Sequence, residues 1–240
     1  MATIREQLKH DRAQEVATEA VHWTQAHRKT IIAALAGALV LAAVILGVYA
    51  YSQKQNEKAS VELGEAMRTL NTPVRQAGEA ADPNQPSFTN VQERDKAALG
   101  KFEAVASSFP HTDSGHYALY LAAVVQLDNG DTAGAEKGFE RARKEGNREV
   151  SSLAKAALAD IYFTTNREKD GVQLLHDLID NPSTSVPKSE AQIRLAQHFD
   201  DVKKKEDAVR IYEQLKKDNP NNPIGQAAEQ RIKEITATVK

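Results

Sequence analysis

The longest apolar stretch of the chain, residues 31–51, lies close to its start. All 21 of these residues are uncharged, and ten of them are Ile, Leu or Val. A helix needs about 20 apolar residues to cross the hydrocarbon core of a bilayer, and a helix of a soluble protein usually keeps a polar stripe. This stretch has no such stripe, so residues 30–53 are predicted to form one transmembrane helix that is retained in the mature protein.

Two other interpretations of the apolar stretch stay open. Val48-Tyr49-Ala50 is an acceptable cleavage site for a signal peptide, but the apolar run is longer than the usual 7–15 residues of such a peptide. The segment before the apolar stretch is also longer than the start of a usual signal peptide, and it contains both acidic and basic residues. The remaining alternative is a helix buried in a soluble core, which the lack of polar positions disfavours.

Charge near the two ends of the predicted span gives a weak indication of orientation. The basic sequence HRK at residues 27–29 precedes it, and Lys54 and Lys58 follow it. Short tails usually stay inside the cell, while long domains translocate largely regardless of charge. Residues 1–29 are therefore predicted to be a cytoplasmic tail, and the rest of the chain to lie on the far side. Ala34, Ala38 and Ala42 form a row of small residues through which two such helices could self-associate.

After the predicted transmembrane helix, hydrophobic residues recur with the spacing of an amphipathic helix, and one segment rich in proline interrupts this pattern. Residues 54–91 are predicted to be a helical extension followed by a linker that contains Pro73, Pro83 and Pro86. From there on the chain repeats about every 37 residues, since Leu-Ala pairs begin at positions 121, 158 and 195. Turn residues divide each unit into two helices. Such a period predicts a solenoid in which each helical hairpin packs only on its neighbours.

Residues 92–240 resemble the tetratricopeptide family. The third unit carries that family's pattern of Leu, small and aromatic positions in its first helix, and of small, aromatic and apolar positions followed by Pro in its second. The matching residues are Leu195, Ala196, Phe199, Ala208, Tyr212, Leu215 and Pro220. The helix around Phe102 looks like half a repeat, and residues 225–239 look like a capping helix. The resemblance implies a tetratricopeptide-like solenoid for residues 92–240, so that together with the predicted transmembrane helix the chain is expected to be all-α.

Composition and the absence of known motifs exclude several classes of function. The net charge is −2 and cysteine is absent, which argues against nucleic-acid binding and excludes disulfides and thiolate chemistry. No nucleotide-binding or hydrolase motif occurs. His111, Asp113 and His116 could ligate a metal, but they are interpreted as polar residues of a turn, and His198 as a groove or capping residue. We expect no catalytic, cofactor or metal site, and no enzyme activity.

A binding surface remains, on the inner face formed by the first helix of each repeat. Tetratricopeptide repeats use this face as a groove for peptides or partner segments, so the resemblance implies that its positions here contact a partner. The mapped residues are His116, Leu119, Ala123, Gln126, Leu153, Ala156, Asp160, Phe163, Glu190, Ile193, Gln197 and Asp200. They are apolar with an acidic tendency, which favours partners that expose apolar and basic segments.

The layout and the run from HRKTII through the apolar stretch to SVELGEAM are similar to the YfgM family of ancillary subunits of the bacterial SecYEG translocon. That resemblance implies a bacterial inner-membrane protein with a periplasmic domain, whose partners are translocon subunits, periplasmic chaperones or secreted chains. Two alternatives stay open. The segment FPHTDSGHYALYLAAVVQLDNGD resembles repeats of envelope scaffolds that act in division or outer-membrane assembly, and a regulator could act through the cytoplasmic tail.

Overall fold

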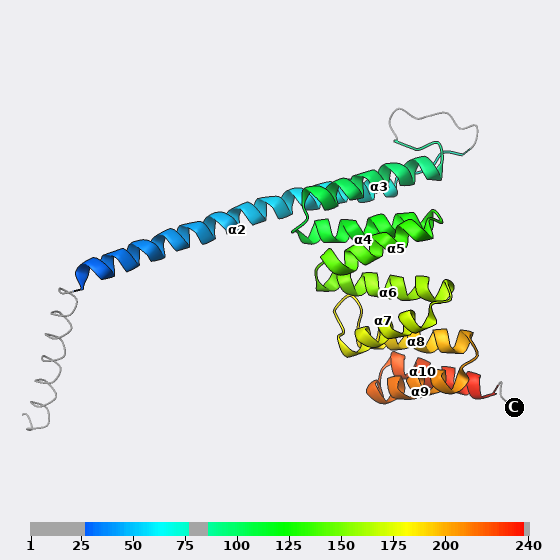
Figure 1. Cartoon of the computed structure of the whole chain (residues 1–240). Helices are drawn as coiled ribbons and strands as arrows, with labels where there is room; N and C mark the ends of the chain where they lie inside the picture. Colours follow the sequence, from blue (N-terminus) through cyan, green and yellow to red (C-terminus); the bar gives the residue numbers. More distant parts are fainter. Residues whose placement is uncertain (1–26, 77–85, 238–240) are drawn as a thin grey trace, which may run out of the picture. The chain divides into compact units, whose positions relative to one another are not determined.

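The computed structural model describes residues 27–76 and 86–237, and within them the regular secondary structure is α-helical apart from one isolated β-bridge. The helices are α2 (Arg28–Leu70), α3 (Val91–Ser108), α4 (Asp113–Asp128), α5 (Thr132–Glu145), α6 (Arg148–Thr164), α7 (Glu168–Asp180), α8 (Lys188–Asp201), α9 (Lys205–Asp218) and α10 (Pro223–Ala237). Figure 1 shows their order along the chain. The chain divides into two compact units, Met1–Lys54 and Gln55–Lys240. The all-α prediction is confirmed.

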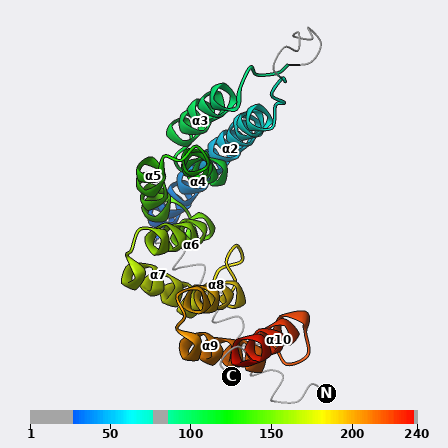
Figure 2. The same cartoon turned by 90° about the vertical axis from the view of Figure 1, so that its right-hand side faces the viewer.

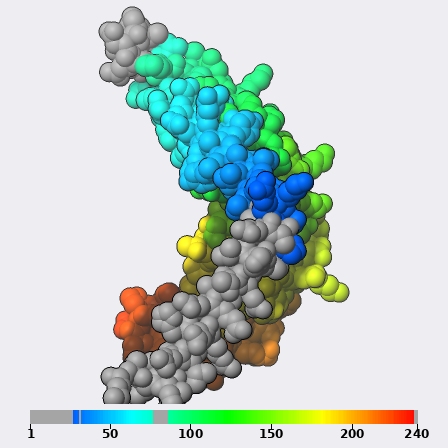
Figure 3. Space-filling model, turned by 90° about the vertical axis from the view of Figure 1, so that its left-hand side faces the viewer, coloured from blue at the N-terminus to red at the C-terminus, as the bar shows by residue number. Residues whose placement is uncertain are grey.

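The described part of the first unit is the apolar half of α2. Its large side chains stand exposed, with Leu39 72% and Leu46 67% accessible, and Figure 3 shows this helix as blue and light-blue spheres. Among the described residues, α2 alone is long and apolar enough to cross a membrane by length and composition.

The second unit is a stack of helical hairpins, α4 with α5, α6 with α7 and α8 with α9, closed by α10 against α9 (Figure 2). Each helix packs chiefly on the helices before and after it. Three residues join the two helices of each hairpin, and the middle one is always left-handed: Gly130 at φ 79°, Asn166 at φ 59° and Lys203 at φ 64°. The three hairpins therefore turn in the same way.

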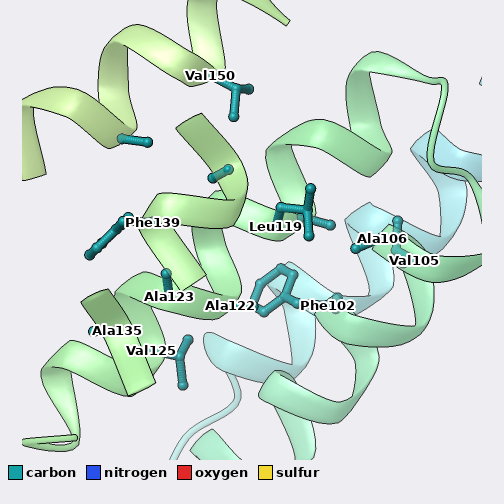
Figure 4. Close-up of a cluster of buried hydrophobic side chains, with 14 of the residues drawn as sticks. Phe102, Val105, Ala106, Leu119, Ala122, Ala123, Val125, Ala135, Phe139 and Val150 are labelled. Atoms are coloured by element: carbon teal, nitrogen blue, oxygen red, sulfur yellow. The ribbon is translucent and has the colours of Figure 1, made fainter. Parts of the chain in front are cut away.

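The core confirms the repeat pattern read from the sequence. The aromatic position of the second helices is filled by Phe102, Phe139 and Tyr212, which are at most 3% exposed. Figure 4 shows Phe102 of α3 beside Leu119 and Ala122 of α4. Many other buried positions are alanines, so neighbouring helices approach closely.

The first hairpin begins earlier than the sequence analysis placed it. Ala59 and Ala66 of α2 are fully buried in the same core cluster as Phe102 of α3. Residues 55–70 are therefore the first helix of a repeat whose second helix is α3, and the half repeat around Phe102 has its partner. The sequence did not reveal this first repeat because 20 residues, 71–90, separate its two helices, whereas three residues join the helices of each later hairpin. The longer connection breaks the 37-residue period.

The two ends of this long connection meet next to the hairpin. Val74 and Phe88 form a parallel bridge, in which the Arg75 amide donates to the Phe88 carbonyl and the Phe88 amide donates to the Pro73 carbonyl, both at 3.0 Å. Asn90 then caps α3 by accepting a hydrogen bond from the Glu93 amide at 2.8 Å. The cap sets the start of α3 so that its apolar side meets α2 and α4.

The hairpin turn makes a prediction about two glycines. A Cβ added at Gly130 or at Gly100 would meet no atom within 4 Å, so the backbone alone decides the effect of an alanine. Gly130→Ala should lower the free energy of unfolding by about 1–2 kcal/mol because it forces a side chain into the left-handed region. Gly100→Ala, inside α3, should raise it by about 0.5–1 kcal/mol.

Urea denaturation of the full chain in detergent micelles, followed by circular dichroism, measures both changes. Effects of the same sign at the two positions would contradict the role of the turn.

Candidate partner-binding groove

The inner face of the stack is formed by the first helices of successive hairpins. A hollow of about 550 Å³, here called the central hollow, lies over α6 and α8. Its apolar lining includes Tyr120 of α4, Leu153 and Ala156 of α6, Ile193 of α8 and Ile224 of α10. The surface thus spans four helices from four consecutive repeats, counting the cap.

Two further hollows extend the same face. One of about 400 Å³ shares Asp160, Glu190 and Arg194 with the central hollow and is bordered by Phe163 and His198. Another of about 420 Å³ lies between α8 and α10 and shares Ile193 and Ile224. Because the hollows share lining residues, we treat them as one groove, defined as the groove over α6, α8 and α10.

Seven of the twelve groove residues mapped from the sequence line this groove. They are Leu153, Ala156, Asp160, Phe163, Glu190, Ile193 and Gln197. Asp200 is held by Arg231 of α10 through a salt bridge at 2.8 Å. The structure therefore brings together the residues that come from the second and third repeats.

The four residues mapped onto α4 lie elsewhere. Leu119 and Ala123 are buried, at 7% and 0% exposure. Gln126 borders a small hollow of about 240 Å³ that α3 and α5 also line, and His116 sits in the first turn of α4 with its Nδ1 buried. None of these four residues lines the groove. The positions that face the groove in α6 therefore do not correspond to groove-facing positions in α4.

Close packing of α4 on α5 explains this difference. A Cβ on Gly138 of α5 would lie 2.7 Å from the Cβ of Ala123, so this side of α4 is pressed against its partner helix. Tyr120, one residue beyond Leu119, faces the central hollow instead. Arg194 and Val186 also line the central hollow, although the repeat pattern did not predict them there. The seven-residue connection 181–187 that places Val186 in the groove carries no periodic signal.

The polar side of the groove carries more negative than positive charge. Arg194 Nη1 lies 2.7 Å from Asp160 Oδ2, and Arg194 Nε lies 2.9 Å from Glu190 Oε1. One guanidinium thus serves two carboxylates from two helices. The Asp160 side chain is about half exposed, and the partial loss of its hydration against the groove wall raises its pKa, although the charge and hydrogen bond of Arg194 oppose that shift.

His198 is a packing residue at the edge of the groove. Its ring stacks on Phe163 with centroids 3.6 Å apart and planes 8° from parallel, and its Nε2 lies 3.2 Å from Glu168 Oε1. The pKa of Glu168 is lowered, first by its hydrogen bond from Lys204 and also by that from His198. The interpretation of His198 as a groove-facing residue fits this position.

The turn before α4 uses its polar side chains for local structure. Thr112 Oγ1 accepts a hydrogen bond from the Gly115 amide at 3.0 Å and so caps α4, while Asp113 accepts one from Asn147 Nδ2 at 2.7 Å. Within the described ranges no three His, Asp or Glu residues gather closely enough to hold a metal ion. His111, Asp113 and His116 are not brought together as a ligand set.

An ion pair between two successive repeats stabilises their packing behind the groove. Arg167, before α7, donates from both terminal nitrogens to the two carboxylate oxygens of Glu136 in α5, each at 2.7 Å. Its guanidinium also lies 4.2 Å from the ring centre of Tyr162. Bidentate pairs of this kind are stronger than ordinary surface pairs.

Comparison with protein families identifies the class of this chain. A family model described as a tetratricopeptide repeat-like domain matches residues 21–182, more than half of the chain, so the chain belongs to that family. A crystal structure of nearly identical TPR-like repeats of a Podosopora anserina protein described as a kinesin light chain is similar in fold. The TM-score is 0.52 at 14% identity, over 75% of this chain and 85% of that one. Comparison with curated proteins gave no significant match.

The family defines the general function of the second unit. Tetratricopeptide-like repeats typically form non-enzymatic scaffolds with an extended binding surface, so this chain carries an interaction domain whose partners are proteins.

The bidentate pair leads to a prediction about stability. Glu136→Gln should lower the free energy of unfolding at pH 7 by about 1 kcal/mol, because a partly buried, bidentate pair between repeats is lost. Glu145→Gln, which removes an exposed pair with Arg141 within α5, should cost at most about 0.5 kcal/mol. Urea denaturation compares the two variants with the native chain.

The same pair has a pH dependence with a definite sign. The Arg167 hydrogen bonds lower the pKa of Glu136; its stabilisation is therefore complete above the ordinary Glu value of about 4.3 and is lost as pH falls through the lowered value. The difference in the free energy of unfolding between Glu136→Gln and the native chain should therefore shrink as pH falls below about 4.3. A difference that stays constant from pH 7 to pH 3 would rule out this contribution.

Proposed function

We propose that this chain is a single-pass membrane protein whose tetratricopeptide-like domain binds other proteins at a membrane surface. The observation that supports it most directly is the exposed apolar half of α2, which is followed in the same chain by an interaction domain. Leu39, Val40, Leu41 and their neighbours are more than half exposed, and so large an apolar surface on a soluble monomer would be unusual. A bilayer would cover it.

The proposed division of the chain follows from this role. Residues 1–29 form a cytoplasmic tail, of which all but the last three lie outside the described residues, and residues 30–53 cross the bacterial inner membrane. Residues 54–91 and 92–240 lie in the periplasm. The repeat domain extends back to Gln55, since Ala59 and Ala66 belong to its core. Self-association of the membrane helix through Ala34, Ala38 and Ala42 is a secondary part of the proposal.

The particular role we propose is that of an ancillary translocon subunit. The similarity to the YfgM family supports it, and it implies translocon subunits, periplasmic chaperones and emerging secreted chains as partners. A groove with apolar walls and surplus carboxylates fits segments that are not yet folded, because such segments expose apolar and basic side chains together.

Orientation can be tested because the chain has no cysteine of its own. We expect His10→Cys to resist a membrane-impermeant maleimide in cells with a permeabilised outer membrane. Lys101→Cys, on an exposed site of α3, should be labelled. Both should react after the inner membrane is dissolved in detergent, which controls for reactivity. Labelling of His10→Cys alone, before detergent is added, would reverse the proposed orientation.

Partners can be tested by crosslinking in cells. A photoreactive amino acid at Gln197, on the groove, should capture translocon subunits, periplasmic chaperones or secreted chains; one at Glu213, on the outer helix α9, serves as the matched position. Capture of only division or outer-membrane assembly proteins would replace the translocon role by that of an envelope scaffold. Loss of function on deletion of residues 1–29 alone would favour a regulator.

A further inference from the structure

Two carboxylates that line the central hollow, here called the cation site, are paired with an arginine of the same chain. Asp160 projects from α6 and Glu190 from α8, and both line the two adjoining hollows. Arg194 lies between them and bonds one oxygen of each. Since a carboxylate can accept several hydrogen bonds, Asp160 Oδ1 and Glu190 Oε2 remain able to accept from another donor.

The three charged side chains are accessible from solvent. The exposed fractions of the Asp160, Glu190 and Arg194 side chains are 53%, 43% and 36%. Ion pairs this exposed contribute little to stability, about 0–1 kcal/mol each. Arg194 can therefore give up one carboxylate to an incoming cation at small cost.

The surroundings of the charges define the kind of cation that fits. Leu153, Ala156 and Ile193 form an apolar wall beside the carboxylates, and Tyr120 lies at the α4 end of the hollow. An aliphatic side chain that ends in a positive charge matches this combination, with its stem on the apolar wall and its head at the carboxylates. A small hydrated cation would leave the wall uncovered, and an acidic segment would meet an excess of negative charge.

We propose that the groove over α6, α8 and α10 binds an extended, unfolded protein segment through a lysine or arginine flanked by apolar residues, and that Arg194 competes with that residue for Asp160 and Glu190. This inference rests on the proposed function, because it names the partner of the same groove. Arg194 thereby acts as an internal competitor that sets the affinity: segments with a basic residue displace it, and purely apolar segments leave it in place.

The test uses the full chain in nanodiscs of phosphatidylcholine, a lipid without net charge that does not attract basic peptides. The probe is a fluorescein-labelled nine-residue peptide of Ala and Leu with one central Lys, and its binding is followed by fluorescence anisotropy. Two further peptides carry Gln or Glu in place of the Lys. We expect the Lys peptide to bind at least 10-fold more tightly than the Glu peptide, and to weaken as salt is added.

Substitutions in the groove distinguish the role of Arg194 from that of the carboxylates Asp160 and Glu190. Asp160→Asn and Glu190→Gln should each weaken the Lys peptide about 5–10-fold. Arg194→Gln should tighten it about 3–10-fold and should leave the Gln peptide unchanged. Asp180→Asn, an exposed residue at the end of α7 away from the groove, is the matched control and should have no effect. Thermal melts verify that each variant is folded.

Several outcomes would overturn the proposal. These are equal binding of the Lys and Glu peptides, weaker binding in Arg194→Gln, or a concentration-dependent increase in the mass of Arg194→Gln, which would identify a second copy as the occupant. Crosslinking from Gln197 in cells is independent of these measurements. Capture of translocon or secreted proteins without preference for the Lys peptide would leave the proposed function standing and reject the cation site.

Discussion

The structure depends on the close approach of neighbouring helices at alanine and glycine. Ala98, Ala123, Ala159 and Ala196 are all completely buried, and Gly138 has no room for a methyl group beside Ala123. Packing at this density lets each pair of helices exclude water with few large side chains, and the buried aromatic residues then fill the remaining space. Every hairpin relies on its neighbours in this way, which is why the chain needs several repeats and a cap.

The groove follows from that packing. The stacking of successive hairpins brings side chains that are distant in sequence, such as Asp160 and Arg194, together on one surface. The layer of buried side chains behind them is mostly apolar. Pairs such as Arg167 with Glu136 then fix one repeat against the next, so that the spacing of the groove residues is held by contacts outside the groove.

The sequence predicted the fold well where the repeats are regular. Leu195, Ala196 and Tyr212 were assigned as packing positions and are buried. The start of the stack was missed because a long insertion breaks the period between α2 and α3, and periodicity is the only signal that single-sequence reasoning has for a repeat. The use of the groove by a partner stays a prediction. Seven of the positions mapped onto α6 and α8 line its hollows, whereas Leu119 and Ala123 are buried because α4 packs closely on α5, a tertiary contact that no local pattern encodes.

The bridge between Val74 and Phe88 bears on how this chain can evolve and be engineered. It brings the ends of the long connection together beside the first hairpin, so α2 and α3 keep their contact whatever length of chain lies between the bridged residues. Because the entropy of closing a loop grows only slowly with its length, related chains can gain or lose residues here at little thermodynamic cost. The same position is therefore a natural insertion point for an epitope or a reporter domain, well separated in sequence from the groove.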